Sequence, residues 1–165
     1  MLTQGRLKEV LNYDPETGEF YWRVAVSNVA RGARAGCADA RGYWRIKVDG
    51  KMYTRHRLAW LYMHGGWPMD KIDHKNRVVG DDRIENLREA TQAQNLANSK
   101  LPKNSSSGFK GVSYLKGAKK RPWCSSISNN GVNFYLGSFE TPEKAYAAYC
   151  AKAKELHGEF FIPLA

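Results

Sequence analysis

Apolar side chains recur at helical spacing at the start of the chain and again near its middle. Two sets each fit one face of a helix: Leu2, Leu7, Val10 and Leu11, and then Leu58, Ala59, Leu61 and Tyr62. Between these helices, residues 19–24 are aromatic and β-branched and predict a strand. Residues 43–54 predict a hairpin that turns at Asp49-Gly50. The pattern indicates helices mixed with short antiparallel strands.

The next segment predicts the order strand, loop, strand and helix. Residues 71–89 contain two short strand patterns around a polar loop at residues 76–83. Thr91 opens a Thr-x-x-Gln capping box, which predicts that a helix starts there. That helix carries two amide side chains, Asn95 and Asn98.

A stretch rich in Ser, Pro and Gly at residues 102–108 predicts a linker. Three strand patterns follow, at residues 110–114, 122–128 and 133–137. Thr141 and Pro142 predict the cap and first position of a helix that ends near His157. The fold class is therefore α+β. We expect a first module at residues 1–99, a linker at 100–107 and a second module at 108–161.

The charge of the chain favours a polyanionic partner. The net charge is +10, and residues 99–121 hold seven basic residues and no acidic one. The three cysteines form no Cys-x-x-Cys pair, which suits a reducing cytoplasm and argues against a zinc knuckle. No signal-peptide pattern is seen, and no apolar stretch reaches the roughly 18 residues that span a bilayer. We expect a cytoplasmic protein without a membrane partner.

The residues with the clearest chemistry are a neighbouring carboxylate and imidazole followed by two amides. Asp73 and His74 are adjacent, and Asn86 and Asn95 come later in the strand–loop–strand–helix segment. Together they can hold one divalent cation against a phosphodiester and deprotonate a water beside it. Because neighbouring strand residues point to opposite faces, Asp73 and His74 can share a phosphate only if the strand ends or distorts there.

These residues resemble the HNH nuclease motif of phage homing endonucleases, whose fold is a ββα-metal finger. The matching positions are Arg55 to Leu58, Asp73-His74, Ile84 to Arg88 and Gln94-Asn95, preceded by an aromatic opening at residues 12–18. The resemblance covers most of residues 1–98, with the metal finger at about 55–98. It implies DNA phosphodiester hydrolysis that leaves 5′-phosphate and 3′-hydroxyl ends.

The resemblance also implies a role for each residue. Asp73 and Asn95 would bind one Mg²⁺ or Mn²⁺ ion per site, with Asn98 as the alternative ligand. His74 would be the general base, and Asn86 would orient the loop after it. Asn95 stands where the motif's name has His, and its carbonyl oxygen suits a hard cation.

Three nearby basic residues have two possible roles each. His56, at a helix start between two arginines, is predicted to be structural or to contact phosphate. Arg83 and Arg88 are candidates for DNA phosphate binding, with surface ion pairs as the alternative. The partners available for such pairs are Asp81, Asp82 and Glu89.

The second module resembles the plant ethylene-responsive-factor DNA-binding domain, a three-stranded antiparallel sheet packed on one helix. The resemblance is carried by residues 108–112, Trp123, residues 135–139 and residues 141–149. It implies a DNA-contacting face made by Lys110, Ser113, Tyr114, Trp123, Ser125, Asn133 and Tyr135. Phosphate contacts are expected from Lys119, Lys120 and Arg121. The strands carry few arginines, which are the usual readers of guanine.

Together these patterns favour a metal-dependent, site-directed DNA endonuclease of the homing type, acting on double-stranded DNA in the host cell of a phage. Nicking and double-strand cutting both stay open. We expect no small-molecule cofactor, and a monomer rather than a dimer. The alternatives are a non-catalytic DNA-binding regulator that uses the second module, and an RNA-binding or RNA-cutting protein.

Overall fold

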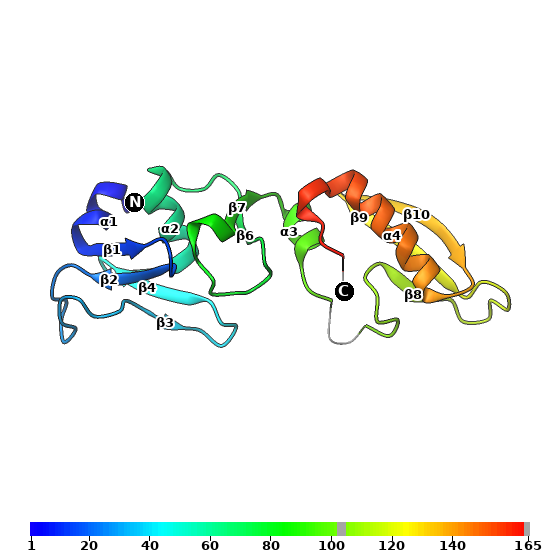
Figure 1. Ribbon diagram of the computed structural model, residues 1–165, viewed down its shortest axis with the longest axis horizontal. Coiled ribbons are helices and arrows are strands. Elements are labelled where there is room, and N and C mark those ends of the chain that lie inside the picture. The colour runs from blue at the N-terminus through cyan, green and yellow to red at the C-terminus, as the bar shows by residue number, and fades with distance from the viewer. Residues whose placement is uncertain (102–104, 164–165) are drawn as a thin grey trace. The chain divides into compact units, whose positions relative to one another are not determined.

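A computed structural model describes residues 1–101 and 105–163 (Figure 1). The described residues form small antiparallel sheets and four α-helices, which confirms the α+β class. They pack into two units that divide after Thr91. None of the helices in the described ranges has the length and apolar character needed to cross a membrane.

The first part of unit 1 is a hairpin and a three-stranded sheet, each next to a helix. Its elements are α1 (Gln4–Val10), β1 (Leu11–Asp14), β2 (Glu19–Trp22), β3 (Cys37–Ala38), β4 (Trp44–Val48), β5 (Lys51–Thr54) and α2 (Arg55–His64). The hydroxyl of Thr3 caps α1 by accepting a hydrogen bond from the amide of Arg6. Leu7 of α1, Leu11 of β1 and Leu58 of α2 are completely buried in one core. Of the four residues predicted to share the first helix face, Leu2 precedes α1 and Leu11 begins β1, so only Leu7 and Val10 lie on the helix.

Unit 1 ends in the predicted strand–loop–strand segment. Its elements are β6 (Lys71–His74), the 3₁₀ turn η1 (Ile84–Asn86) and β7 (Leu87–Ala90). The two strands pair antiparallel, so that Asp73 lies opposite Arg88 and His74 lies opposite Leu87. Ile72 and Leu87 bury their side chains in the core of unit 1. This packing fixes which face of β6 points inward.

Unit 2 contains a three-stranded antiparallel sheet packed on one helix. Its elements are α3 (Gln92–Asn98), β8 (Val112–Tyr114), β9 (Trp123–Asn129), β10 (Val132–Phe139), α4 (Pro142–His157) and the 3₁₀ turn η2 (Gly158–Phe160). The strand order is β10-β9-β8. Thr141 caps α4 and Pro142 is its first residue, as predicted. Ile127, Tyr149 and Ala153 form the core between sheet and helix.

The packing places α3 with the C-terminal unit. From the sequence we predicted a boundary after residue 99, whereas the chain divides after Thr91, seven residues ahead of the end of α3. Of the predicted linker, residues 102–104 lie outside the described residues. The helix that carries Asn95 and Asn98 is therefore built together with the sheet of unit 2.

Candidate active site

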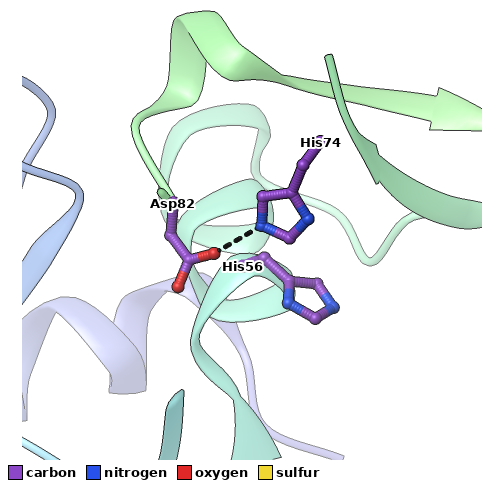
Figure 2. Close-up of side chains that lie close together, drawn as sticks. All are labelled: His56, His74 and Asp82. Atoms are coloured by element: carbon purple, nitrogen blue, oxygen red, sulfur yellow. Dashed lines mark hydrogen bonds and ion pairs between the residues drawn. The ribbon is translucent and has the colours of Figure 1, made fainter. Parts of the chain in front are cut away.

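A buried histidine at the end of β6 is the centre of the candidate site. The Nε2 atom of His74 lies 2.7 Å from Oδ1 of Asp82. Figure 2 shows His74, Asp82 and His56 pointing toward one another from the end of β6, the loop before η1 and the start of α2. His74 and Asp82 are both buried, so their pairing is shielded from water.

Asp82 also pairs with a buried arginine on α2. The Nε atom of Arg55 lies 2.6 Å from Oδ2 of Asp82, and its Nη2 donates to the carbonyl of Gly80 at 2.5 Å. The guanidinium carbon lies 4.8 Å from the centroid of the Trp44 ring. Burial opposes ionisation of Asp82, but the hydrogen bonds from His74 and Arg55 outweigh it and hold its pKa below the usual value. Asp82 is therefore an anion that accepts from both neighbours.

His56 completes the group. Its ring lies edge-on to His74, with centroids 5.4 Å apart, and packs on Tyr43 at 5.7 Å. Burial lowers the pKa of His56 to about 4, so the ring is neutral at neutral pH. Its Nε2 lies 3.2 Å from the hydroxyl of Thr54. Of the two roles predicted for His56, these contacts favour the structural one.

The side-chain donor atoms of His56, His74 and Asp82 lie within 4.8 Å of one another, close enough to hold a metal ion. Two imidazoles and a carboxylate are donors typical of zinc. Both oxygens of Asp82 already accept hydrogen bonds, and a cation there would lie beside the Arg55 guanidinium. This electrostatic conflict favours a hydrogen-bonded chain that holds His74 over a metal centre at these three residues.

Asn86 closes the loop that follows His74. Its Nδ2 donates to the carbonyl of Asp81 at 2.8 Å and to Oδ1 of Asn76 at 3.1 Å. Its Oδ1 accepts from the amide of Asn76 at 3.0 Å, and its main-chain carbonyl accepts from Lys75 at 2.8 Å. A buried amide with this many partners holds both ends of the loop. These contacts suit the loop-orienting role predicted for it.

Asp73 points to the other face of β6. Its Oδ2 lies 2.9 Å from Nε of Arg88, directly across the two strands. Asp73 is buried, and its charge is balanced by this ion pair. A carboxylate is the hard oxygen donor that Mg²⁺ and Mn²⁺ prefer, so the chemistry of Asp73 fits a ligand role. β6 stays regular through His74, however, so within unit 1 the two neighbours face opposite ways.

The two arginines predicted as DNA contacts form ion pairs. Arg88 pairs with Asp73, whereas Glu89 accepts a hydrogen bond from the amide of Met69. Arg83 lies 2.7 Å from Asp81, and its pairing holds the pKa of that carboxyl at about 2. Arg83 also pairs with Glu85 at 2.9 Å, which is exposed. The surface-pair alternative therefore describes Arg83, whereas Arg88 pairs with the buried Asp73, a partner that the alternative did not include. DNA contacts by either arginine stay predictions.

On α3, Asn95 is half-buried and Asn98 is buried. Both are amides that can offer an oxygen to a hard cation. They belong to unit 2, whereas Asp73 and His74 belong to unit 1. The assignment of Asn95 or Asn98 as metal ligand stays a prediction.

The predicted DNA-contacting residues of unit 2 differ in how exposed they are. Asn133 and Tyr135 lie exposed on β10, and Tyr114 and Trp123 pack edge-on with centroids 5.0 Å apart. The basic residues Lys119, Lys120 and Arg121 are exposed in the connection between β8 and β9. Ser125 corrects the prediction, because it is 0% exposed and lies on the strand face that carries Ile127. The ammonium group of Lys110 donates hydrogen bonds to main-chain carbonyls of the same unit.

Two residues of the site were missed in the sequence. Arg55 lies inside the matching motif but was given no role, and Asp82 was considered only as a surface partner for an arginine. The sequence signal was a pair of adjacent carboxylates in the loop, Asp81-Asp82. Nothing in the local pattern distinguishes the one that turns inward.

Two comparisons with known proteins identify the domain in which these residues lie. Residues 53–97 match the HNH endonuclease family. The chain is similar to Protein 3.8 of Escherichia phage T7, with 32% identity over 111 residues that cover 67% of this chain and 89% of that protein. No solved structure matches significantly. The matched residues include His56, His74 and Asp82. Residues 53–97 are therefore an HNH endonuclease domain, and the chain belongs to the same family as Protein 3.8 of phage T7.

Proposed function

We propose that this chain is a metal-dependent, site-directed DNA endonuclease of the homing type. The HNH domain makes it a nuclease and hydrolase with DNA as its substrate. The observation that carries the finer proposal is the buried His74 held by Asp82 within that domain. The ionised carboxylate accepts from the imidazole N–H and so fixes the orientation and tautomer of the ring, as a general base requires.

His74 accepts the proton of the attacking water. Because Asp82 is ionised, it can only accept, so Nε2 of His74 carries the hydrogen that points to it. The basic nitrogen is then Nδ1. When the water is deprotonated, the charge that forms on the imidazolium is stabilised by the Asp82 carboxylate.

Arg55 and Asn86 keep this pair in place. Arg55 holds the second oxygen of Asp82, so the carboxylate cannot rotate away from His74. Asn86 fixes the loop that begins right after His74. Both are positioning residues, since neither needs to touch the substrate.

Asp73 and Asn95 would hold Mg²⁺ or Mn²⁺, as one carboxylate and one amide oxygen with phosphate and water completing the shell. The ion when bound would stabilise charge on the phosphodiester and on the departing 3′ oxygen. The ion pair with Arg88 holds the Asp73 carboxylate on its own face of β6.

The sheet of unit 2 would bind the DNA that the first unit cuts. The resemblance to the ethylene-responsive-factor domain, the exposed Asn133 and Tyr135 and the basic β8–β9 connection support this role. Strand side chains of such a sheet can reach base edges while lysines hold phosphates.

The decisive test is cleavage of supercoiled double-stranded DNA by the purified chain with Mg²⁺, with Mn²⁺ and with EDTA. We expect metal-dependent nicking or linearisation, reduced by about 10²- to 10⁴-fold in His74→Ala. His64→Ala is the matched control, because His64 is an exposed histidine at the end of α2. Binding without cutting in either metal would replace this proposal with the non-catalytic regulator.

A further inference from the structure

The ammonium group of Lys110 lies at the C-terminal end of α3. Its Nζ donates to the main-chain carbonyls of Leu96 at 2.5 Å, Ala97 at 3.0 Å and Ser99 at 3.1 Å. It also lies 3.0 Å from the hydroxyl of Ser99. Leu96 and Ala97 belong to the last turn of α3, and Ser99 follows it. The Leu96 carbonyl also accepts from the amide and the hydroxyl of Ser99, so Lys110 joins a group of donors that closes this end of the helix.

α3 is a short helix that packs against α4 and η2 and buries Ala97 and Asn98. It has seven residues and no basic residue in its last turn. Isolated helices this short are marginal in water and form only when packed. A cation at the C-terminal end also complements the helix dipole, which is negative there. Lys110 therefore supplies a positive charge at the C-terminal end of α3, which has no basic residue of its own in its last turn.

The backbone beside Lys110 is itself fixed. Gly111 has φ +71°, and a Cβ at this position would lie 2.1 Å from the Tyr149 ring of α4. Its carbonyl accepts from the amide of Ser126 on β9 at 2.9 Å. On the other side, Phe109 stacks on Tyr146 with centroids 4.9 Å apart. Lys110 thus connects α3 to a rigid part of the sheet–helix module.

We infer that Lys110 is a positioning residue of the nuclease: it fixes α3, and with it Asn95 and Asn98, on the C-terminal module. This inference rests on the proposed function, in which α3 supplies a metal ligand. It changes the role predicted for Lys110, which was a DNA contact. It also means that the position of α3 depends on the C-terminal module, so removing residues 108–161 would release this helix.

The test compares four full-length variants with the wild type. Lys110→Gln removes the charge, and Lys110→Arg keeps it. Lys120→Gln removes a lysine from the exposed β8–β9 connection, and Lys154→Gln removes an exposed lysine from α4 as a neutral control. Three quantities are measured: amide hydrogen exchange in α3, DNA affinity in EDTA, and the Mg²⁺ concentration that gives half-maximal cleavage.

For Lys110→Gln we expect faster exchange in α3 and a half-maximal Mg²⁺ concentration about tenfold higher, with DNA affinity in EDTA close to that of the wild type. Lys110→Arg should restore both values. Lys120→Gln should weaken DNA affinity and leave the exchange of α3 unchanged.

The inference is overturned if Lys110→Gln loses DNA affinity as Lys120→Gln does while exchange in α3 stays at the wild-type rate. Lys110 would then be the DNA contact that the sequence predicts. If the wild type cleaves DNA with neither metal, the proposed function fails. The exchange measurement still tests whether Lys110 fixes α3. An α3 exchange rate in Lys110→Gln equal to that of the wild type would refute this role, and faster exchange that Lys110→Arg reverses would support it.

Discussion

The two units treat charged side chains in opposite ways. Unit 1 buries charged and polar groups around His74, which are Arg55, Asp73, Asp82 and Asn86. Unit 2 keeps its basic run Lys119, Lys120 and Arg121 exposed and buries mainly apolar and small residues. Burying a charge is costly unless it is paired, so unit 1 must hold each group in a fixed geometry. Exposed lysines need no such order to attract a phosphate backbone.

This difference matches the roles proposed for the two units, catalysis in unit 1 and DNA binding in unit 2. Under the proposed function, the Arg55–Asp82–His74 chain holds the general base in position before the reaction. DNA binding would come from the exposed lysines of unit 2, and its strength would fall as salt screens their charge. Changes in unit 1 should therefore be large and local, and changes on the surface of unit 2 should be graded and salt-dependent.

The largest effect is expected from breaking the buried chain at its centre. Asp82→Ala leaves the Arg55 guanidinium buried without its carboxylate, which should cost about 3–5 kcal/mol of unfolding free energy. Cleavage should fall as well, because His74 loses its partner. Denaturant unfolding of unit 1 and cleavage rates measure the two effects. Asp70→Ala, at an exposed carboxylate, is the control.

The double variant Arg55→Met with Asp82→Leu sharpens this prediction. Removing both charges should recover much of the stability, because no buried charge is left alone. Cleavage should stay low. If the double variant cuts DNA at the wild-type rate, the orienting role of Asp82 is wrong.

Much of this contrast was predictable from the sequence. The order of β6, β7 and α3 follows from local patterns, and so do the strands of unit 2 and the cap of α4. The burial of Ser125 follows from alternation, since Ile127 on the same strand face is apolar. Polarity alone suggested exposure, and the strand period was the better guide.

Other features depend on packing that no local pattern describes. Asp81 and Asp82 are neighbours, yet one pairs with Arg83 at the surface and the other with Arg55 in the interior. Lys110 belongs to the sheet module, but its partners come from α3, more than ten residues earlier. The outcome in both cases follows from where separate segments meet.

The second largest effect is expected from the exposed basic residues of unit 2. Changing Lys119, Lys120 and Arg121 together to Gln should weaken DNA binding by about 10²-fold at low salt, because up to three phosphate contacts are lost. The slope of log affinity against log salt should become shallower by about 2 to 3. Fluorescence titrations over a range of KCl concentrations measure this. An unchanged slope would place the phosphate contacts elsewhere.

A smaller effect should distinguish the two amides of α3. Asn95→Ala should raise the Mg²⁺ concentration for half-maximal cleavage by about tenfold or more, because a ligand oxygen is lost. Asn98 is buried, so Asn98→Ala should mainly lower stability. Cleavage titrations with Mg²⁺ and thermal unfolding separate the two. The reverse result would make Asn98 the ligand.

The smallest effect concerns His157, a buried histidine of unit 2. Among the residues that the structure describes, no buried Asp or Glu lies in that unit. His157 lies at the end of α4, where burial and then the nearby charge of Lys110 lower its pKa. The unfolded chain takes up the proton first, near the ordinary value of about 6.5, so the folded state loses stability as pH falls below it. Above that pH the contribution of the neutral His157 to the stability of the folded state is fully present.

Amide exchange of α4 between pH 7.5 and 5.0, corrected for the intrinsic rate, should show this loss of stability in the wild type and a smaller loss in His157→Gln. His64→Gln is the control at an exposed position. An equal pH dependence in His157→Gln and wild type would show that burial of His157 does not destabilise its charged form. The difference between the units would then concern only the buried carboxylates of unit 1, Asp73 and Asp82.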